Sequence, residues 1–333
     1  MDFKQLQYFL CVVDQGSFTK ASRLLDVAQP ALSRQVRLLE VELKQNLLIR
    51  TGRGVVATEA GRLLTDHGRR IMHQIETARE ELGKLRGTVG GHVDVGIPTS
   101  LSKLLAVRLI SEVRERLPGA ALSISDGLSV PMHESILSGR LDMALLYKPQ
   151  SSPDLDTVTV MKEELYLVCG ASSPSDASPI SLKEVADLPL VIPRRPHEIR
   201  NIVETKMASL GCKPQVMIEV DGVPAILDIL ADGPGYAVLP LYAVAIYSKS
   251  GVYRFRRIVD PCLGSRLVLA TSSRRPRTST QEAVFNLVLE ICSEVLIPAI
   301  NREVALLLAQ QPAAMNTPPT LAYAAAGGGR LDQ

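Results

Sequence analysis

Hydrophobic residues recur at intervals of three or four near the start of the chain, and this spacing predicts three short helices. The first covers residues 3–14, the second covers residues 18–25, and the third begins at Gln29. The Ser17 hydroxyl can cap the second helix, and Pro30 suits the start of the third because its missing N–H has no intrahelical role there. The apolar positions expected to share a core are Leu6, Phe9, Leu10, Val13, Phe18, Ala21, Leu25, Leu32, Val36, Leu39 and Leu43.

The third predicted helix carries a polar stripe opposite its apolar one. The stripe consists of Pro30, Ser33, Arg34 and Arg37. One face can therefore pack on the first two helices, while the other offers hydroxyl and guanidinium groups to base edges and phosphates in a DNA major groove. This arrangement predicts a helix-turn-helix. The alternative is an ordinary three-helix bundle with a solvated charged face.

Two short β-prone segments follow, within residues 47–58. They flank the tripeptide Gly52-Arg53-Gly54, so a hairpin with an exposed arginine at its tip is expected. A hairpin at this place is a wing, and residues 1–58 are predicted to form an all-α winged helix-turn-helix that binds double-stranded DNA. The candidate DNA-binding residues on these elements are Ser17, Thr19, Lys20, Pro30, Ser33, Arg34, Arg37, Arg50 and Arg53.

A long helix is predicted from Glu59 to about Leu85, within a linker and dimerisation segment of residues 59–88, with Thr58 as its cap. Its apolar positions alternate spacings of three and four, with Gly68 in one slot, as in a coiled-coil seam. A single long helix with such a seam needs a partner, and a second copy of the chain would form a symmetric dimer with two recognition helices. The alternative is that the seam packs on its own chain. The seam residues are Leu64, Ile71, Ile75, Ala78, Leu82 and Leu85, and residues 86–91 follow as a hinge.

Residues 89–310 alternate between strand and helix patterns, which is typical of parallel α/β architecture. The segment also contains an internal repeat of short sequence motifs, at an offset of about 95 residues. Matching pairs are Ile97-Pro98 with Ile192-Pro193, Asp126-Gly127 with Asp221-Gly222, and Val130-Pro131 with Val223-Pro224. The order of these matches predicts two lobes of similar plan. The strand pattern at 266–271 could return to the first lobe, so the chain would cross between the lobes twice and leave a cleft.

In open parallel sheets, ligands bind beyond the carboxyl ends of the strands, near helix N-termini. Two segments are expected there, one in each lobe: residues 98–102 and residues 193–197. Hydroxyl groups facing two arginines and a histidine suit a small anion such as a carboxylate; the alternative is that the hydroxyls cap a helix and the arginines are solvated. The candidate effector-binding residues are Thr99, Ser100, Leu101, Ser102, Leu128, Ser129, Tyr147, Pro193, Arg194, Arg195 and His197.

The charge of the whole chain hides an asymmetry. The 333 residues carry a formal net charge of +2, from 37 Lys and Arg against 35 Asp and Glu. Residues 1–88 carry 14 basic and 10 acidic residues, a net charge of +4, whereas the remainder has a net charge of −2. An excess of +4 is modest, so several DNA-binding arms are expected to act together.

The sequence gives little support to an enzyme, a metal site or a membrane protein. It lacks G-x-S-x-G, P-loop and H-E-x-x-H motifs, and its five histidines and five cysteines are scattered. No cofactor and no catalytic residue are expected. The most apolar stretch found, residues 225–247, contains aspartates and prolines, so a cytoplasmic protein with mostly buried, reduced thiols is predicted. Residues 311–333 form a low-complexity tail, predicted to be disordered.

Two other classes of function remain as alternatives. One is a cytoplasmic small-molecule binding protein or enzyme with an incidental helical cap at its N-terminus. The other is a thiol-based redox switch through Cys212. The cysteines closest to it in sequence, Cys169 and Cys262, are more than forty residues away, which disfavours the switch.

The residues of the first 66 positions resemble the LysR-type transcriptional regulators. The resemblance is carried by LQYFLCVVDQGSFTKASRLLDVAQPALSRQVRLLEVEL and LLIRTGRGVVATEAG, and it extends more loosely to about residue 300. The AQPALSRQ helix and the LLIRTGRGV wing are most similar to the subset that contains the nitrogen assimilation control protein. The tail beyond about residue 310 is longer than is usual for the family.

The resemblance implies a fold, partners and site residues. It implies that Ala28, Gln29, Pro30, Ser33, Arg34 and Arg37 lie at or in a recognition helix, with Arg53 on the wing. It implies a homotetramer built as a dimer of dimers through paired linker helices, and a periplasmic-binding-protein-like effector domain whose cleft binds a small inducer. RNA polymerase is an implied partner.

Overall fold

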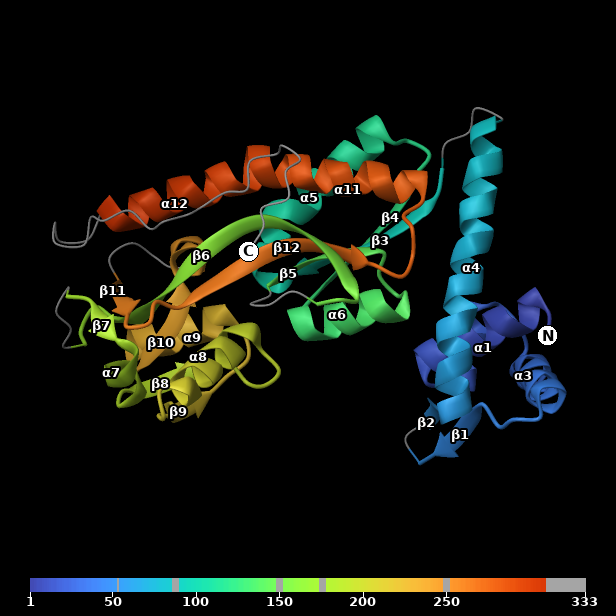
Figure 1. The fold of residues 1–333 in the computed structure, drawn as a ribbon, viewed down its shortest axis with the longest axis horizontal. Coiled ribbons are helices and arrows are strands. Elements are labelled where there is room, and N and C mark those ends of the chain that lie inside the picture. The colour runs from blue at the N-terminus through green and yellow to red at the C-terminus, as the bar shows by residue number, and fades with distance from the viewer. Residues whose placement is uncertain (53, 86–89, 148–151, 174–177, 248–251, 310–333) are drawn as a thin grey trace. The chain divides into compact units, whose positions relative to one another are not determined.

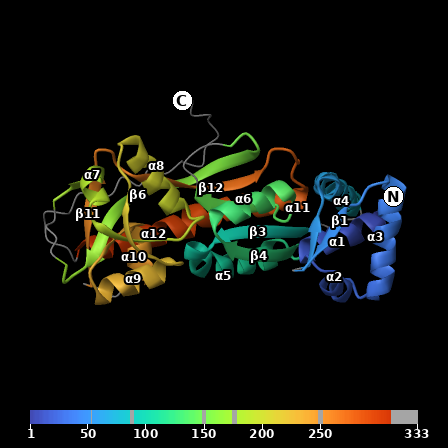
Figure 2. The ribbon, with the colours of Figure 1, turned by 90° about the horizontal axis from the view of Figure 1, so that it is seen from below.

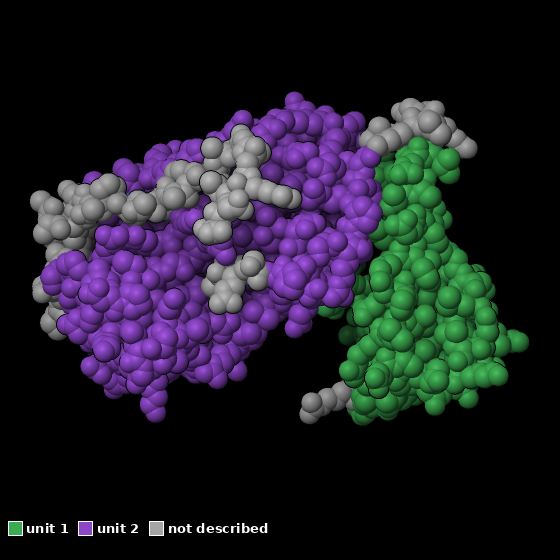
Figure 3. All heavy atoms as spheres, viewed as in Figure 1, with its two compact units in different colours: residues 1–91, 138–140 green, residues 92–137, 141–333 purple. Residues whose placement is uncertain are grey.

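The computed structural model describes residues 1–52, 54–85, 90–147, 152–173, 178–247 and 252–309 (Figure 1). Arg53 at the predicted wing tip, residues 86–89 of the predicted hinge, and the predicted tail from residue 311 lie outside the described residues. The chain forms two compact units, which Figure 3 colours separately. The first comprises residues 1–91 together with 138–140, and the second comprises the remainder.

Three helices form the core of the first unit, as the apolar spacing predicted. They are α1 (Phe3–Gln15), α2 (Phe18–Leu24) and α3 (Gln29–Leu43). The Ser17 side chain accepts the backbone N–H of Lys20 and so caps α2. Leu32, Val36 and Leu39 of α3 are almost completely buried against the other two helices. Leu43, the last residue of α3, is exposed instead of buried as predicted, because the helix ends there in solvent.

The predicted hairpin is present and is attached to α3. It consists of β1 (Leu48–Thr51) and β2 (Gly54–Ala57), which pair antiparallel. The Glu40 Oε1 atom accepts the backbone N–H groups of Leu47 at 2.9 Å and Leu48 at 3.3 Å. One carboxylate on α3 therefore holds the start of the hairpin.

In helix α4 (Glu59–Leu85), the first part of the apolar seam packs on α1 of the same chain. Thr58 caps it by accepting the Gly61 N–H at 2.9 Å. A Cβ atom at Gly68 would lie 2.9 Å from the Leu6 Cδ1 atom, so the glycine permits a close crossing between α4 and α1. Further along the seam, the Ile71 and Leu82 side chains remain exposed.

The first lobe of the second unit is a small parallel α/β sheet. Its strands are β3 (His92–Pro98), β4 (Ala121–Gly127) and β5 (Met143–Tyr147), and its helices are α5 (Thr99–Arg116) and α6 (Ser129–Ser138). Strand β3 lies between β4 and β5 and is parallel to both.

The second lobe repeats this plan. Its parallel strands are β8 (Pro189–Ile192), β9 (Gln215–Glu219) and β10 (Tyr236–Pro240), and its helices are α7 (Leu182–Ala186), α8 (Glu198–Ser209), α9 (Val223–Asp232) and α10 (Leu241–Tyr247). Strand β8 lies between β9 and β10, as β3 lies between β4 and β5. The internal repeat in the sequence is therefore a repeat of structure. The short β7 (Ile180–Ser181) and β11 (Tyr253–Val259) complete this lobe.

Two long antiparallel strands connect the lobes, which confirms the predicted double crossing. They are β6 (Leu155–Gly170) and β12 (Gly264–Ser272). Strand β6 pairs with β12 up to Glu164 and then with β10 from Leu165 onward. Strand β12 also pairs with β5, so it returns the chain to the first lobe.

The described chain ends in one long helical stretch that runs alongside both lobes (Figures 1 and 2). It consists of α11 (Ser279–Ile291), the π-helical turn η1 (Cys292–Leu296) and α12 (Ile297–Ala309). Within the described ranges, it is the one helix long and apolar enough to cross a membrane by length and composition alone. The prediction that residues 225–247 form the most apolar stretch was therefore wrong. Packing accounts for this apolar composition, because Val284, Val288, Ile300 and Val304 are buried in the core of the second unit.

Candidate functional site

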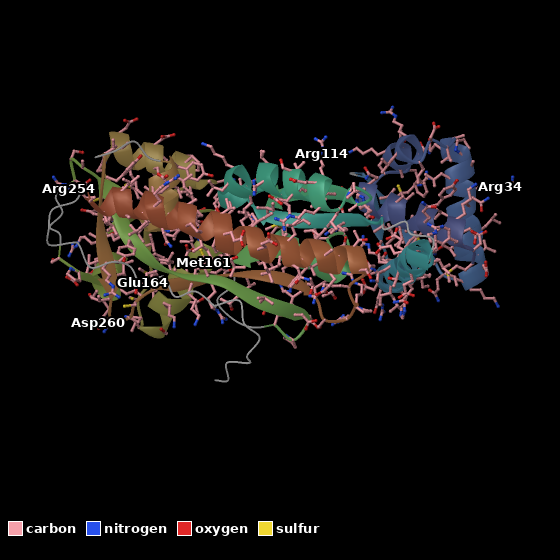
Figure 4. The ribbon with its side chains drawn as sticks, turned by 90° about the horizontal axis from the view of Figure 1, so that it is seen from above. Arg34, Arg114, Met161, Glu164, Arg254 and Asp260 are labelled. Carbon is pink, nitrogen blue, oxygen red and sulfur yellow. The ribbon has the colours of Figure 1, made fainter. Side chains whose placement is uncertain are left out.

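The polar stripe of α3 forms an exposed surface on the first unit. Pro30, Arg34 and Arg37 are exposed, and Ser33 is half-buried at the foot of the stripe. Arg34 lies at the outer edge of the unit, with its side chain directed away from the helices (Figure 4). Ala28 and Gln29, which precede and begin α3, are also exposed. The start of α3 therefore offers donors and acceptors to a groove-shaped partner.

Two further basic residues, Lys20 and Arg50, lie on α2 and on the wing, and Arg37 of α3 is oriented by a neighbouring carboxylate. Thr19 and Lys20 are exposed on the first turn of α2, whereas the Ser17 hydroxyl is used as the helix cap. The Arg50 guanidinium lies over the Phe18 ring at 5.5 Å from its centroid, so the wing strand packs its cation on α2. Arg37 approaches Glu40 at 3.3 Å and is thereby oriented by the carboxylate that also anchors the wing.

A cavity of about 370 Å³ lies between the two lobes of the second unit. It opens where the carboxyl ends of β3, β4 and β10 meet the N-termini of their following helices, as the parallel topology predicted. Its lining is mainly apolar. Six of the predicted effector-binding residues line it: Thr99, Ser100, Leu128, Ser129, Tyr147 and His197.

The other five predicted residues lie elsewhere. Leu101 is fully buried in the hydrophobic core, because the second residue after the helix start turns inward. Ser102 and Pro193 are not among the lining residues. Arg194 is exposed and lies 3.7 Å from Asp221, while the Arg195 guanidinium is held by Glu204 on α8 at 2.8 Å. The two arginines on which the anion hypothesis depended therefore do not face the cavity.

Hydroxyl groups from both lobes meet at one wall of the cavity. The Tyr147 and Tyr242 hydroxyl oxygens are 2.5 Å apart, and the Tyr242 hydroxyl donates to Ser100 Oγ at 3.1 Å. The Tyr247 hydroxyl donates to the Ser100 carbonyl oxygen at 3.4 Å. Burial raises the pKa values of Tyr147 and Tyr242 well above the usual range, so both remain neutral donors and acceptors.

His197 has a structural role at the edge of the cavity. Its Nδ1 atom accepts the Ile199 N–H at 3.3 Å and so caps α8. Burial lowers the pKa of the imidazole, and the nearby Asp221 partly opposes this effect. The ring that accepts this bond is the neutral form.

Sequence reasoning missed one group in particular, the Glu163 side chain on β6. It lines the cavity with a residue exposure of 6%, and burial raises its pKa to about 8. The segment Lys162-Glu163-Glu164 did not indicate a binding site, because a run of charged residues usually lies on the solvated surface. Asp221 and Gly222, which also line the cavity, were visible in the internal repeat but were not recognised as lining residues.

The described residues contain no group of three or more histidine, cysteine, aspartate or glutamate side chains that could hold a metal ion. The five cysteines are free, and Cys262 is exposed rather than buried. The Cys212 thiol donates to the carbonyl oxygen of Met207, in the last turn of α8, at 3.3 Å. No thiol–thiol pair among these residues supports a redox switch.

Two family models match the chain. Residues 3–62 match the bacterial regulatory helix-turn-helix proteins of the lysR family, and residues 86–293 match the LysR substrate binding domain. The chain belongs to the LysR family of transcriptional regulators. LysR regulators bind DNA, and the chain is accordingly a regulator of transcription and not an enzyme.

Two relatives of this LysR regulator are similar over nearly their whole length. The nitrogen assimilation regulatory protein nac of Klebsiella aerogenes is 32% identical over 307 residues, which cover 92% of this chain and 99% of that protein. The nac protein of Escherichia coli strain K12 is 30% identical over 294 residues, covering 88% of this chain and 96% of its own. The predicted similarity to the nitrogen-control subset is confirmed.

Solved LysR structures share the fold. A full-length OxyR variant from Pseudomonas aeruginosa matches with a TM-score of 0.69 at 21% identity, covering 89% of this chain and 97% of that one. Full-length CbnR in complex with its target DNA matches with a TM-score of 0.55 at 23% identity, covering 88% and 100% of the two chains. The winged helix-turn-helix followed by a two-lobed α/β domain is thus the LysR fold.

Proposed function

We propose that this LysR regulator binds specific operator sequences through α3 and the wing, and that a small molecule in the cavity between the lobes controls its effect on transcription. The exposed Arg34 on α3 is the observation that carries the first part. Its side chain is long, charged and directed outward from a helix whose other face is fixed in the core. Arginine is the side chain best suited to a two-donor contact with guanine in the major groove.

The remaining basic groups support phosphate contacts. Lys20 is exposed on α2 and Arg37 on α3. The Arg50 guanidinium of the wing packs on Phe18, and Arg53 is the predicted tip residue. Contacts of this kind position a protein on the duplex without reading its sequence. They are few per subunit, so we propose that two or four arms bind together.

Helix α4 supports the assembly. Its exposed Ile71 and Leu82 continue the seam whose first part, Leu64 and Gly68, packs on α1. We propose that the exposed part pairs with the same helix of a second copy, and that two such dimers form a homotetramer. A cytoplasmic location and contact with RNA polymerase complete the proposal and follow from the role of such regulators.

The cavity supports the sensing step. It has the size of a small metabolite, and it is bounded by both lobes and by the two crossover strands. A ligand that contacts both lobes favours one degree of lobe closure over another, and only such a difference in affinity can shift the regulator between states.

The test is a footprint of the full-length protein on its own promoter, with Arg34→Ala compared to wild type. Loss of a two-donor base contact should weaken specific binding by about 1–3 kcal/mol, which is roughly 5- to 150-fold. Arg114→Ala is the matched control, because Arg114 is an exposed arginine on α5 of the second unit (Figure 4). Equal footprints for Arg34→Ala and wild type would refute the assignment of α3 as the recognition helix.

A further inference from the structure

The cavity between the lobes contains a buried carboxyl oxygen for which the described chain supplies no partner. The Glu163 residue is 6% exposed, and its Oε2 atom makes no hydrogen bond to any described residue. Burial raises the pKa of this carboxyl group to about 8, because the ionised form would lose its hydration. Buried polar atoms are nearly always paired, so an unpaired one that lines a cavity points to a ligand group.

The charged groups around the cavity are acidic. Apart from Glu163, the titratable side chains in its lining are Tyr147, His197, Glu198, Asp221, Tyr242 and Tyr247. Among the described residues, no lysine or arginine lines the cavity. The Arg195 and Arg200 guanidinium groups are both bound to Glu204 of α8, and none of these three residues lines the cavity. Arg194 pairs with Asp221 at 3.7 Å, whereas the Glu163 Oε2 atom has no hydrogen-bond partner among the described residues. A carboxylate beside Glu163 would therefore face an acidic group that no described partner offsets.

The remaining walls define the rest of the ligand. Leu128, Val130, Ile199 and Val223 give the cavity an apolar lining. The Tyr147 and Tyr242 hydroxyl groups already bond to each other and to Ser100. The Glu163 Oε2 atom, which is buried and has no hydrogen-bond partner among the described residues, is thus available to a ligand in this cavity of about 370 Å³.

We propose that the cavity binds a small organic ammonium ion with an apolar body, whose N–H groups donate to the Glu163 carboxylate. The inference rests on the proposed effector site and names the chemical class of its ligand. On binding, the Glu163 proton leaves to the solvent and the positive ligand replaces it as the partner of the carboxylate. No covalent bond forms or breaks in the ligand.

The position of Glu163 connects this event to the lobes. It is opposite Ser265 of β12 in the sheet register, two residues before Leu165, where β6 begins to pair with β10. Both strands are the connections between the lobes. A charge pair formed here lies at the hinge, and it changes the electrostatics of the segment about which the lobes can close.

The test is calorimetric titration of the full-length protein with three matched series. The first series is benzylamine, 2-phenylethylamine and tyramine; the second consists of the corresponding alcohols; the third consists of the corresponding carboxylates. We expect the amines to bind at least tenfold more tightly than the alcohols and the carboxylates to show no binding. Repeating the titration in two buffers of different ionisation enthalpy should show release of close to one proton per amine at pH 6.5, with affinity rising up to tenfold per pH unit below about pH 8.

Two variants distinguish the carboxyl group from its surroundings. Glu163→Gln should lose at least tenfold in amine affinity and should no longer release a proton. Glu164→Gln is the matched control, because Glu164 is the next residue on β6, bonds to Arg257 at 2.7 Å and does not line the cavity. It should bind amines like wild type.

Other outcomes overturn the ammonium assignment. These are equal binding of alcohols and amines, preference for carboxylates, unchanged amine binding in Glu163→Gln, or no binding in any series. None of these outcomes contradicts the proposed function in transcription, which is tested separately by footprinting on the promoter. Failure of the proposed function would instead appear as a ligand that binds the cavity but leaves the footprint and the transcript level unchanged.

Discussion

The Tyr147 and Tyr242 hydroxyl oxygens lie 2.5 Å apart, and the two residues are separated by 95 positions in the chain. Tyr147 ends β5 of the first lobe, and Tyr242 lies on α10, just after β10 of the second lobe. The two strands occupy corresponding places in the repeated plan. The internal sequence repeat thus brings two similar side chains together at one wall of the cavity, where they bridge the lobes.

The first prediction concerns this bridge. Tyr242→Phe removes the hydroxyl that bonds to both Tyr147 and Ser100. We expect it to lower the free energy of unfolding by about 1–3 kcal/mol, because the partners are left buried and unpaired. Urea denaturation of the full-length protein measures the change. A double-mutant cycle with Tyr147→Phe isolates the pair, and strictly additive effects would show that the hydroxyls are not coupled.

Patterns along the chain were enough to predict the elements of this fold. The three-four spacing gave the helices of the first unit, Gly52 and Gly54 indicated the wing, and the repeated dipeptides gave two lobes with a double crossing. These features are local or periodic, and the same local preferences persist in the folded protein.

The composition of the cavity could not be predicted in the same way. Whether Arg195 turns to a ligand or to Glu204 depends on α8, which places Glu204 nine residues later. Whether Glu163 is solvated or buried depends on its pairing with β12, about 100 residues away. Local sequence carries neither fact, and so sequence reasoning placed Arg194 and Arg195, and not Glu163, at the cavity.

The second prediction follows from the raised pKa of Glu163. In the unfolded chain this carboxyl ionises near pH 4.3, whereas burial raises its pKa in the folded protein to about 8. The folded state keeps the proton between these values while the unfolded state loses it. The contribution of Glu163 to the free energy of unfolding is therefore highest below about pH 4, and it falls as pH rises to about pH 8.

Glu163→Gln removes this dependence. We expect the variant to be more stable than wild type at pH 8, by on the order of 4 kcal/mol, with the difference shrinking toward pH 5. The other titratable groups of the cavity, including His197 and Asp221, are present in both proteins and cancel in the comparison. A difference that is constant between pH 5 and pH 8, measured by urea denaturation, would contradict the raised pKa.

The third prediction concerns the attachment of the wing to α3. Glu40→Ala removes the carboxylate that accepts the Leu47 and Leu48 N–H groups. We expect a loss of about 1–3 kcal/mol in stability and weaker DNA binding, because the wing is no longer held beside the helix. Glu42→Ala is the control, since Glu42 is exposed on the same helix and pairs only with the N-terminal ammonium among its described contacts. A full-strength footprint with Glu40→Ala would show that the wing position does not depend on this carboxylate.

The fourth prediction uses two glycines of the first unit. A Cβ atom at Gly61 would lie 2.0 Å from the Leu47 backbone carbonyl oxygen, whereas one at Gly52 would meet nothing within 4 Å. Gly61→Ala must therefore displace the backbone where the wing begins, and we expect a loss of at least about 1–3 kcal/mol. Gly52→Ala should leave stability within about 0.5 kcal/mol of wild type. Equal thermal midpoints for the two variants would refute the close approach of α4 and the wing.

The last prediction tests the proposed pairing of α4. Leu82 lies on the seam and is 61% exposed, while Leu63 on the same helix lies off the seam and is 62% exposed. A buried leucine contributes about 1.5–3 kcal/mol, and a symmetric interface contains two copies. Leu82→Glu should thus raise the dimer dissociation constant by at least about a hundredfold, as measured by sedimentation equilibrium, because two carboxylates would meet in an apolar seam. Leu63→Glu, which makes the same change at equal exposure, should leave assembly intact, and an effect of similar size from both would place the interface on another face of α4.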